Sequence, residues 1–104
     1  MALQTGELLF TMSLSKLAQE HIHASIFMME CYTRHRNLDY GDICDEDKRI
    51  NEDALVSGAR IMSSYTIPDE LKEHCRDDKL WVITEAKNQD GNRLCTTILF
   101  PSEY

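Results

Sequence analysis

The stretch KLWVITEAKNQDGNRLCTTILF, residues 79–100, decides the fold of this chain. Residues 80–85 alternate between two sides of an extended chain and are rich in the branched and aromatic residues that strands favour. Asp90–Gly91 is a strong hairpin signal, because glycine tolerates the positive φ angle that tight turns require. Residues 93–100 supply the returning strand, which Pro101 ends. The stretch therefore predicts two antiparallel strands joined by a turn.

Further segments extend this hairpin into a sheet. RIMSSYTI, residues 60–67, alternates between an apolar and a more polar side, which predicts a third strand. Residues 68–78 predict either a short helix or an exposed loop. GELLFTM, residues 6–12, is too short for periodicity to decide, and predicts either a fourth strand or the approach to a helix. The candidate core residues of the sheet are Trp81, Ile83, Ile98 and Phe100.

Apolar residues between positions 14 and 35 recur at spacings of three and four, which predicts a helix with Ser13 as its N-cap. An alternative is a break near His23–Ser25, where Ser25 is able to cap a second helix from Ile26. Met28 and Met29 are expected in the core, with an adaptable apolar binding patch as the alternative.

An acidic run follows this helix. Asn37–Asp53 contains seven acidic residues opposed by two basic ones. Asp45 is a suitable N-cap for a helix over residues 46–57, and carboxylates in the first turn of a helix are favoured by its dipole. Gly58 stands where a helix-ending glycine belongs. The preference for acidic residues at the N-cap and first turn of a helix therefore accounts for much of the acidic run.

Together these segments predict an α+β fold in a single domain, residues 1–104. We expect N-terminal helices packed on one face of a three- to four-stranded antiparallel sheet, because a sheet this small needs a covering layer to be stable.

The chain carries 18 acidic and 11 basic residues, a formal net charge of −7. This balance argues against direct binding of nucleic acid or of anionic membranes, which depends on Lys and Arg. No window approaches the roughly 18 apolar residues of a membrane span, and the N-terminus lacks a secretory pattern. We therefore expect a cytoplasmic protein with free thiols. The four cysteines are Cys31, Cys44, Cys75 and Cys95.

Helix-start chemistry does not account for Asp39 and Asp42, which flank Tyr40 and Gly41. An aromatic ring between carboxylates is suited to anchor in a pocket lined by Arg or Lys. The alternative is a turn whose ring covers a neighbouring helix. The candidate protein-binding residues are Asp39, Tyr40, Asp42, Asp45, Glu46, Asp47, Glu52 and Asp53.

No catalytic, metal or cofactor motif stands out in the sequence. A Cys/His nucleophile would pair one of the cysteines with His35 or His74. Glu85 would be of interest as an acid or base if it were buried. His21 and His23 would point to different sides of a helix, which makes them a poor pair of metal ligands. We expect no catalytic residue, no metal and no cofactor.

A series of short sequence blocks resembles a family of small uncharacterised proteins encoded on bacterial plasmids and other mobile elements. Its members read D-W-G-D, then E-D-K and N-x-x-A-L, then G-x-R-I-L-S-A-Y, then W-I-I-T-E and T-T-x-L-L-P-x-E-Y. Here the blocks lie in DYGDICDEDKRINEDAL (39–55), GARIMSSY (58–65), LWVITEA (80–86) and TTILFPSEY (96–104), and the resemblance covers His35 to Tyr104.

Three features depart from the family pattern. Tyr40 replaces its Trp, ELKEHCRDD (70–78) lengthens one connection, and KNQDGN (87–92) lengthens the hairpin turn. The resemblance implies a common fold and transfers no catalytic residue. Its mobile-element setting implies contact with host defence systems, such as restriction or CRISPR.

These observations favour a non-enzymatic acidic protein-binding module that occupies a basic surface of a host or defence protein. Its most concrete form is an inhibitor of a defence nuclease, of the anti-CRISPR or anti-restriction type. One alternative is a small enzyme or modifier with a Cys/His or carboxylate site. Another is a homodimeric accessory protein of plasmid maintenance, joined through Met28 and Met29 or through a free strand edge.

Overall fold

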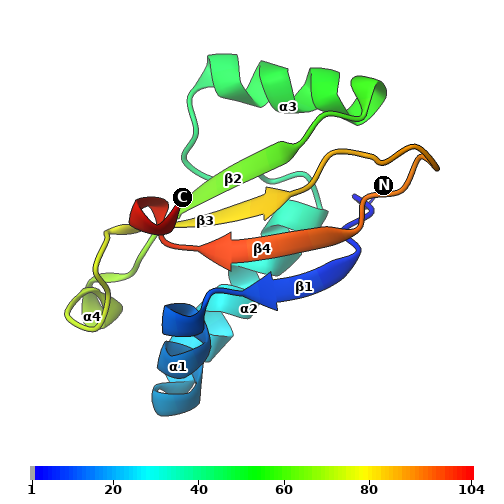
Figure 1. Cartoon of the computed structure of the whole chain (residues 1–104). Coiled ribbons are helices and arrows are strands. Elements are labelled where there is room, and N and C mark those ends of the chain that lie inside the picture. Colours follow the sequence, from blue (N-terminus) through cyan, green and yellow to red (C-terminus); the bar gives the residue numbers. More distant parts are fainter. Residues whose placement is uncertain (1) are drawn as a thin grey trace.

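A computed structural model describes residues 2–104 and shows an α+β fold, as predicted (Figure 1). The strands form one sheet in the order β1-β4-β3-β2, and α1 and α2 pack on it. Within the described part of the chain, no helix has the length and apolar character needed to cross a membrane. The elements are β1 (Glu7–Phe10), α1 (Met12–Glu20), α2 (Ile22–Arg36), α3 (Asp45–Ser57), β2 (Ile61–Thr66), α4 (Asp69–Lys72), β3 (Lys79–Thr84), β4 (Cys95–Leu99) and the 3-10 turn η1 (Pro101–Glu103).

The predicted hairpin is present, because β3 pairs antiparallel with β4, and β2 pairs antiparallel with β3. The apolar segment near the N-terminus is indeed a fourth strand. However, β1 runs parallel to β4, so the sheet is mixed. Because a parallel neighbour cannot be joined by a tight turn, the whole chain between β1 and β4 serves as the connection.

The core lies between the sheet and the first two helices. Ile98 and Phe100 belong to it, as predicted. Trp81 does not: it is only partly buried on the opposite face of the sheet, where its ring meets that of Tyr104 edge-on at 5.7 Å. Both faces of β3 carry apolar residues, so alternation alone could not choose the inner face. The strand and helix residues that meet in the core include Leu14, Leu17, Met28, Leu80 and Val82.

The long predicted helix is broken, as the alternative expected, but at His21, whose backbone is extended. The second helix begins at Ile22, so Ser25 does not cap it. The first of the two helices begins at Met12, and its N-cap is Thr11 rather than Ser13. The Ser13 hydroxyl instead donates to the carboxylate of Glu103 at 2.7 Å, and Thr11 donates to the same carboxylate at 3.0 Å. Side chains from the two ends of the chain are thereby joined at the start of α1.

Helix α3 begins at Asp45, with Cys44 at the N-cap, one residue earlier than predicted. It ends at Gly58, whose φ of 87° is the left-handed conformation expected there. The buried guanidinium of Arg93 donates to the backbone carbonyls of Ala54, Ala59 and Glu85. This contact fixes the end of α3 against the hairpin, because exposed carbonyls at a helix C-terminus attract a cation.

Candidate protein-binding surface

The acidic run begins with a backbone segment that lies against the outer edge of β2. The N–H of Asp42 donates to the carbonyl of Ser64 at 2.7 Å, and the N–H of Ser64 donates to the carbonyl of Tyr40 at 3.1 Å. Gly41 between them has a φ of 73°, and a Cβ at this position would lie 2.1 Å from the Ser64 oxygen. Only glycine allows so close an approach.

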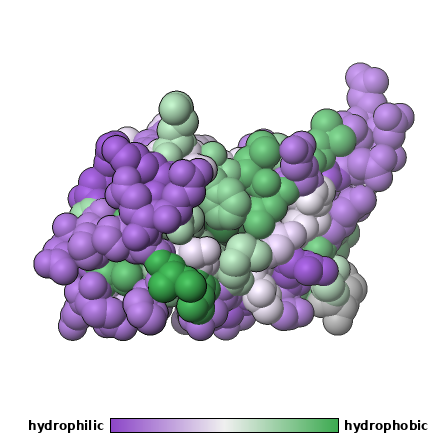
Figure 2. Space-filling view, turned by 90° about the horizontal axis from the view of Figure 1, so that it is seen from below, coloured by the Kyte–Doolittle hydropathy of each residue, from purple (hydrophilic) through white to green (hydrophobic). Residues whose placement is uncertain are grey.

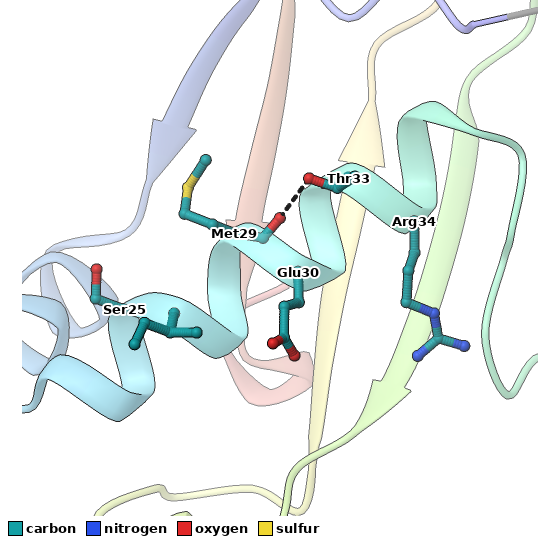
Figure 3. Close-up of a pocket in the computed structure, with 6 residues that line it drawn as sticks. Ser25, Met29, Glu30, Thr33 and Arg34 are labelled. Carbon is teal, nitrogen blue, oxygen red and sulfur yellow. Dashed lines mark hydrogen bonds between the residues drawn. The ribbon is translucent and has the colours of Figure 1, made fainter.

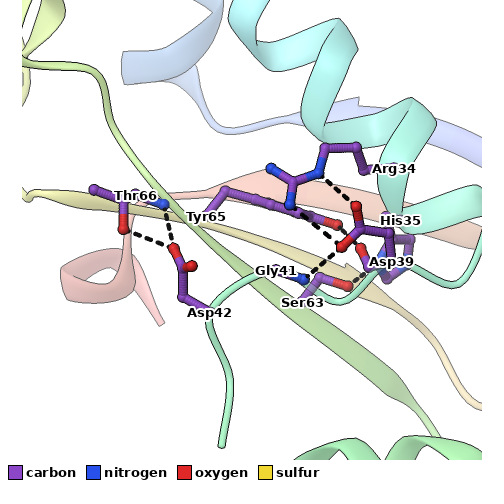
Figure 4. Close-up of polar contacts among 8 residues, drawn as sticks. All are labelled: Arg34, His35, Asp39, Gly41, Asp42, Ser63, Tyr65 and Thr66. Atoms are coloured by element: carbon purple, nitrogen blue, oxygen red, sulfur yellow. Dashed lines mark hydrogen bonds and ion pairs between the residues drawn. The ribbon is translucent and has the colours of Figure 1, made fainter.

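The side chains of Asp42 and Asn51 bind further backbone groups on the outer edge of β2, and we call this set of contacts the edge seal. The carboxylate of Asp42 accepts the backbone N–H of Thr66 at 2.8 Å and its hydroxyl at 2.6 Å (Figure 4). The amide of Asn51 donates to the carbonyl of Met62 at 2.8 Å and accepts its N–H at 3.2 Å. The outward N–H groups of β2, at Met62, Ser64 and Thr66, are therefore all hydrogen-bonded.

Asp39 braces the turn that leads into this segment. Its carboxylate accepts two hydrogen bonds from Arg34, at 2.8 and 3.3 Å, and one from the N–H of Gly41 at 3.1 Å (Figure 4). Its carbonyl accepts the hydroxyl of Tyr65 at 2.7 Å. The hydrogen bond from Arg34 is the main cause that lowers the pKa of Asp39. Asp39 is therefore engaged within its own chain.

The expectation that Tyr40 is an exposed anchor is wrong. Its side chain is 5% exposed and packs in a second apolar cluster with Ile43, Ile61 and Ala54 of α3. The alternative, a ring that covers a neighbouring helix, is confirmed. The Tyr40 hydroxyl makes no hydrogen bond with any described residue, and burial, with a smaller contribution from Glu52, raises its pKa to about 12.

The remaining candidate residues lie on α3. Asp45, Glu46, Glu52 and Asp53 are exposed there, and Asp47 is partly buried. Lys48 and Arg49 stand exposed among them. The eight candidate residues thus separate into a group that binds or packs within the fold and a group on α3. The first group is Asp39, Tyr40 and Asp42.

A chain of buried hydrogen bonds, which sequence reasoning missed, links α2 to the sheet. His35 is fully buried, with Nδ1 2.6 Å from the hydroxyl of Ser63 and Nε2 2.8 Å from that of Thr84 (Figure 4 shows His35 and Ser63). The Thr84 hydroxyl lies 2.6 Å from that of Thr96, which donates to the carbonyl of Thr5.

The directions of these bonds follow from one fixed donor. The Thr96 hydroxyl donates to the Thr5 carbonyl, so it can only accept from the Thr84 hydroxyl. Because the Thr84 hydroxyl donates to Thr96, it accepts the Nε2–H of His35. These directions place a proton on Nε2 of His35, and because burial favours the uncharged ring, Nδ1 then accepts from Ser63. Burial lowers the pKa of His35 to about 4. Since Ser63 is also fully buried, this pair presents no atom to a substrate.

The Cys/His and carboxylate groups considered as catalytic sites are placed as follows. Cys31 is buried, which raises its pKa to about 12, and burial also raises the pKa of Cys75. The ring of His74 stacks on that of His21, with centroids 4.0 Å apart. Glu85 is exposed. Among residues 2–104, no three potential ligands converge on a metal position.

The outer face of α2 carries large apolar side chains that the fold does not cover. Ile22, Ile26 and Met29 are 72%, 50% and 43% exposed. They recur at helical spacing, opposite the buried face that holds Met28 and His35. Met28 is therefore core, as expected, whereas Met29 is not.

Two hollows adjoin on this face. The first is shallow and widely open to solvent, and is lined only by α2 residues (Figure 3). Figure 3 shows Met29 on one flank of the helix, with Glu30 and Arg34 on the other. The second, of 410 Å³, lies between α2 and α4, and shares Ile26 and Glu30 with the first. It adds Leu71 to the apolar lining and is further lined by His23, Phe27, Pro68 and Glu70.

Protein-family models, curated proteins and solved structures give no match to this chain. The two hollows and the stripe Ile22, Ile26 and Met29 are therefore interpreted from their own chemistry. We call them together the α2 face.

The role of Asn51 is tested by replacing it with alanine. We expect Asn51→Ala to lower the free energy of unfolding by about 2 kcal/mol, because both Met62 backbone groups lose their partner. Asp53→Ala is the matched control, since it brings a similar gain in helix propensity and removes an exposed side chain. Urea denaturation measures both. Equal stability of the two variants would contradict the edge seal.

The neutral state of His35 predicts a dependence of stability on pH. Between about pH 4.5 and 6.5 the unfolded chain binds a proton on His35 that the folded chain excludes, so the free energy of unfolding falls by roughly 2 kcal/mol as pH is lowered through this window. The pKa values of Asp39, Asp42 and Glu103 are lowered in the folded chain, so these carboxyl groups change the free energy of unfolding at pH values below this window.

Denaturation of His35→Gln and of the exposed-site control His23→Gln at several pH values checks this expectation. His35→Gln should be less stable at pH 7 and show a flatter profile from pH 4.5 to 6.5, whereas His23→Gln should keep the wild-type profile. An unchanged slope in His35→Gln would show that another group causes the dependence.

Proposed function

We propose that this chain is a non-enzymatic protein-binding module that docks through the α2 face. The observation that carries the proposal is the exposure of Ile22, Ile26 and Met29 on a helix whose other side forms the core. Exposed apolar groups that adjoin in hollows are typical of protein-binding surfaces. Met29 adds an unbranched, adaptable side chain that fits varied partner shapes.

The charges around the α2 face favour a basic partner. Glu30 and Glu70 line the hollows. Arg34, also at the rim, has its guanidinium bound to Asp39 and placed 4.8 Å from the centre of the Tyr65 ring. The net charge of −7 attracts a positive surface from a distance. The partner segment would therefore present apolar side chains flanked by Lys or Arg.

The concrete partner that we propose is a defence nuclease, which the chain would inhibit. Support comes from the resemblance to mobile-element proteins and from the basic surfaces that such enzymes use to hold nucleic acid. The exposed carboxylates of α3 would add long-range attraction. They are Asp45, Glu46, Glu52 and Asp53.

The α2 face is tested with Ile26→Asp/Met29→Asp, and Val56→Asp on α3 is the control because Val56 is 90% exposed and lies on another helix. All three proteins are used to capture partners from a bacterial host lysate, and thermal unfolding confirms that each is folded. We expect the wild type and the control to retain a nucleic-acid enzyme and to inhibit it, and the double variant to bind at least about tenfold more weakly.

Equal capture by the double variant would exclude the α2 face as the docking surface. Specific capture of a protein that is not a nucleic-acid enzyme would keep the docking surface and exclude the nuclease partner.

A further inference from the structure

The two edges of the sheet differ in whether their outward backbone groups have hydrogen-bond partners. The outer edge of β2 is sealed, whereas β1 forms the other edge, with no strand beyond it among the described residues (Figure 1). The N–H groups of Glu7 and Thr11 point to β4, where they donate to Leu94 and Ile98 at 2.9 and 3.3 Å. Because backbone groups alternate in direction along a strand, those of Leu8 and Phe10 point away from the sheet.

Apart from its length of four residues and the charge of Glu7, the open edge lacks the features that normally keep strand edges apart. Lysine, proline, bulges or a covering loop usually protect such an edge. Residues 2–15 contain a single charged side chain, Glu7, and no proline. Apolar side chains stand exposed on and beside the strand instead: Leu9, Phe10 and Met12 are 39%, 37% and 92% exposed.

We propose that β1 pairs antiparallel with β1 of a second copy of this chain, which joins the two sheets into one. The charge distribution favours a second copy as the occupant. Two chains that each carry a net charge of −7 repel each other over most of their surfaces. They approach at least cost where acidic residues are scarce, and residues 2–15 are such a segment. A basic partner would gain nothing from this neutral edge.

In one register, the outward backbone groups of both Leu8 and Phe10 form hydrogen bonds with the second copy. With Leu9 opposite Leu9 of the second copy, Leu8 stands opposite Phe10 of the second copy, and each such pair exchanges two hydrogen bonds. The Leu9 side chains then meet as a close cross-strand pair. Glu7 faces Thr11 of the second copy, so no like charges are opposed. Shifting the register by one residue in either direction would separate the Leu9 pair.

In this arrangement each α1 lies at one end of the paired strands. Each α1 begins at Met12, directly after the C-terminal end of its β1. In an antiparallel pair these ends lie apart, so the two copies of α1 flank the paired strands at opposite ends. Met12 then stands opposite Gly6 of the second copy. Figure 2 views this side of the molecule from below, and shows apolar residues gathered in its middle between hydrophilic ends.

Light scattering coupled to size-exclusion chromatography tests the pairing. We expect the wild type to form a dimer whose fraction rises with concentration. Leu9→Lys should weaken dimerisation by more than about tenfold, because it places two like charges in direct opposition. Val56→Lys is the matched control and should leave the dimer intact, as should Ile26→Asp/Met29→Asp on the α2 face. A wild type that stays monomeric overturns the proposal, as does a dimer that Leu9→Lys leaves unchanged.

Disulfide trapping tests the register. In a Cys44→Ser background, which removes the exposed thiol, Leu9→Cys should form a covalent dimer under mild oxidation at least about tenfold faster than Val56→Cys, because cross-strand pairs of this kind suit disulfide geometry. Equal rates would overturn the register. The proposal is independent of the α2 face: a monomeric protein could still dock there, and a dimer could form without any docking partner.

Discussion

The outer backbone of β2 is hydrogen-bonded by the acidic run, and these contacts set the structure of the run. Tyr40 and Asp42 supply backbone groups, and Asp42 and Asn51 supply side chains that stand in for a missing neighbouring strand. Asp39 holds the preceding turn through Arg34. Tyr40 is consequently drawn into the apolar cluster below α3. The run is therefore acidic partly because carboxylates are good acceptors for backbone N–H groups and favourable at the start of a helix.

The buried imidazole of His35 fixes α2 relative to the sheet. Its two nitrogens bind hydroxyls on β2 and β3, and Thr84 extends the contact to Thr96 on β4. A helix held at this point can present only one face to the core. Met28 lies on that face with His35, and Ile26 and Met29 are then directed outward. The position of the α2 face is thus a consequence of the buried polar chain.

Local signals were sufficient for the hairpin, the third strand and the helix ended by Gly58, because alternation and turn residues act over a few positions. The parallel partner of β1 was not predictable, since it depends on a pairing between distant parts of the chain. Tyr40 was misplaced for a similar reason: its burial depends on α3 and β2 together. Two features of the sequence point to the polar contacts. Asn51 occupies a place in the apolar stripe of its helix, and Thr84 follows Leu80 and Val82 on the inner side of β3.

Amide hydrogen exchange, followed by NMR at a concentration where the protein is monomeric, tests the contrast between the two edges most directly. The account predicts strong protection of the outward N–H groups of Met62 and Ser64, which have partners in the acidic run. It predicts rapid exchange at Leu8 and Phe10, whose N–H groups face away from β4. Exchange at Met62 and Ser64 as fast as at Leu8 and Phe10 would contradict the conclusion that the acidic run closes one edge of the sheet and leaves the other open.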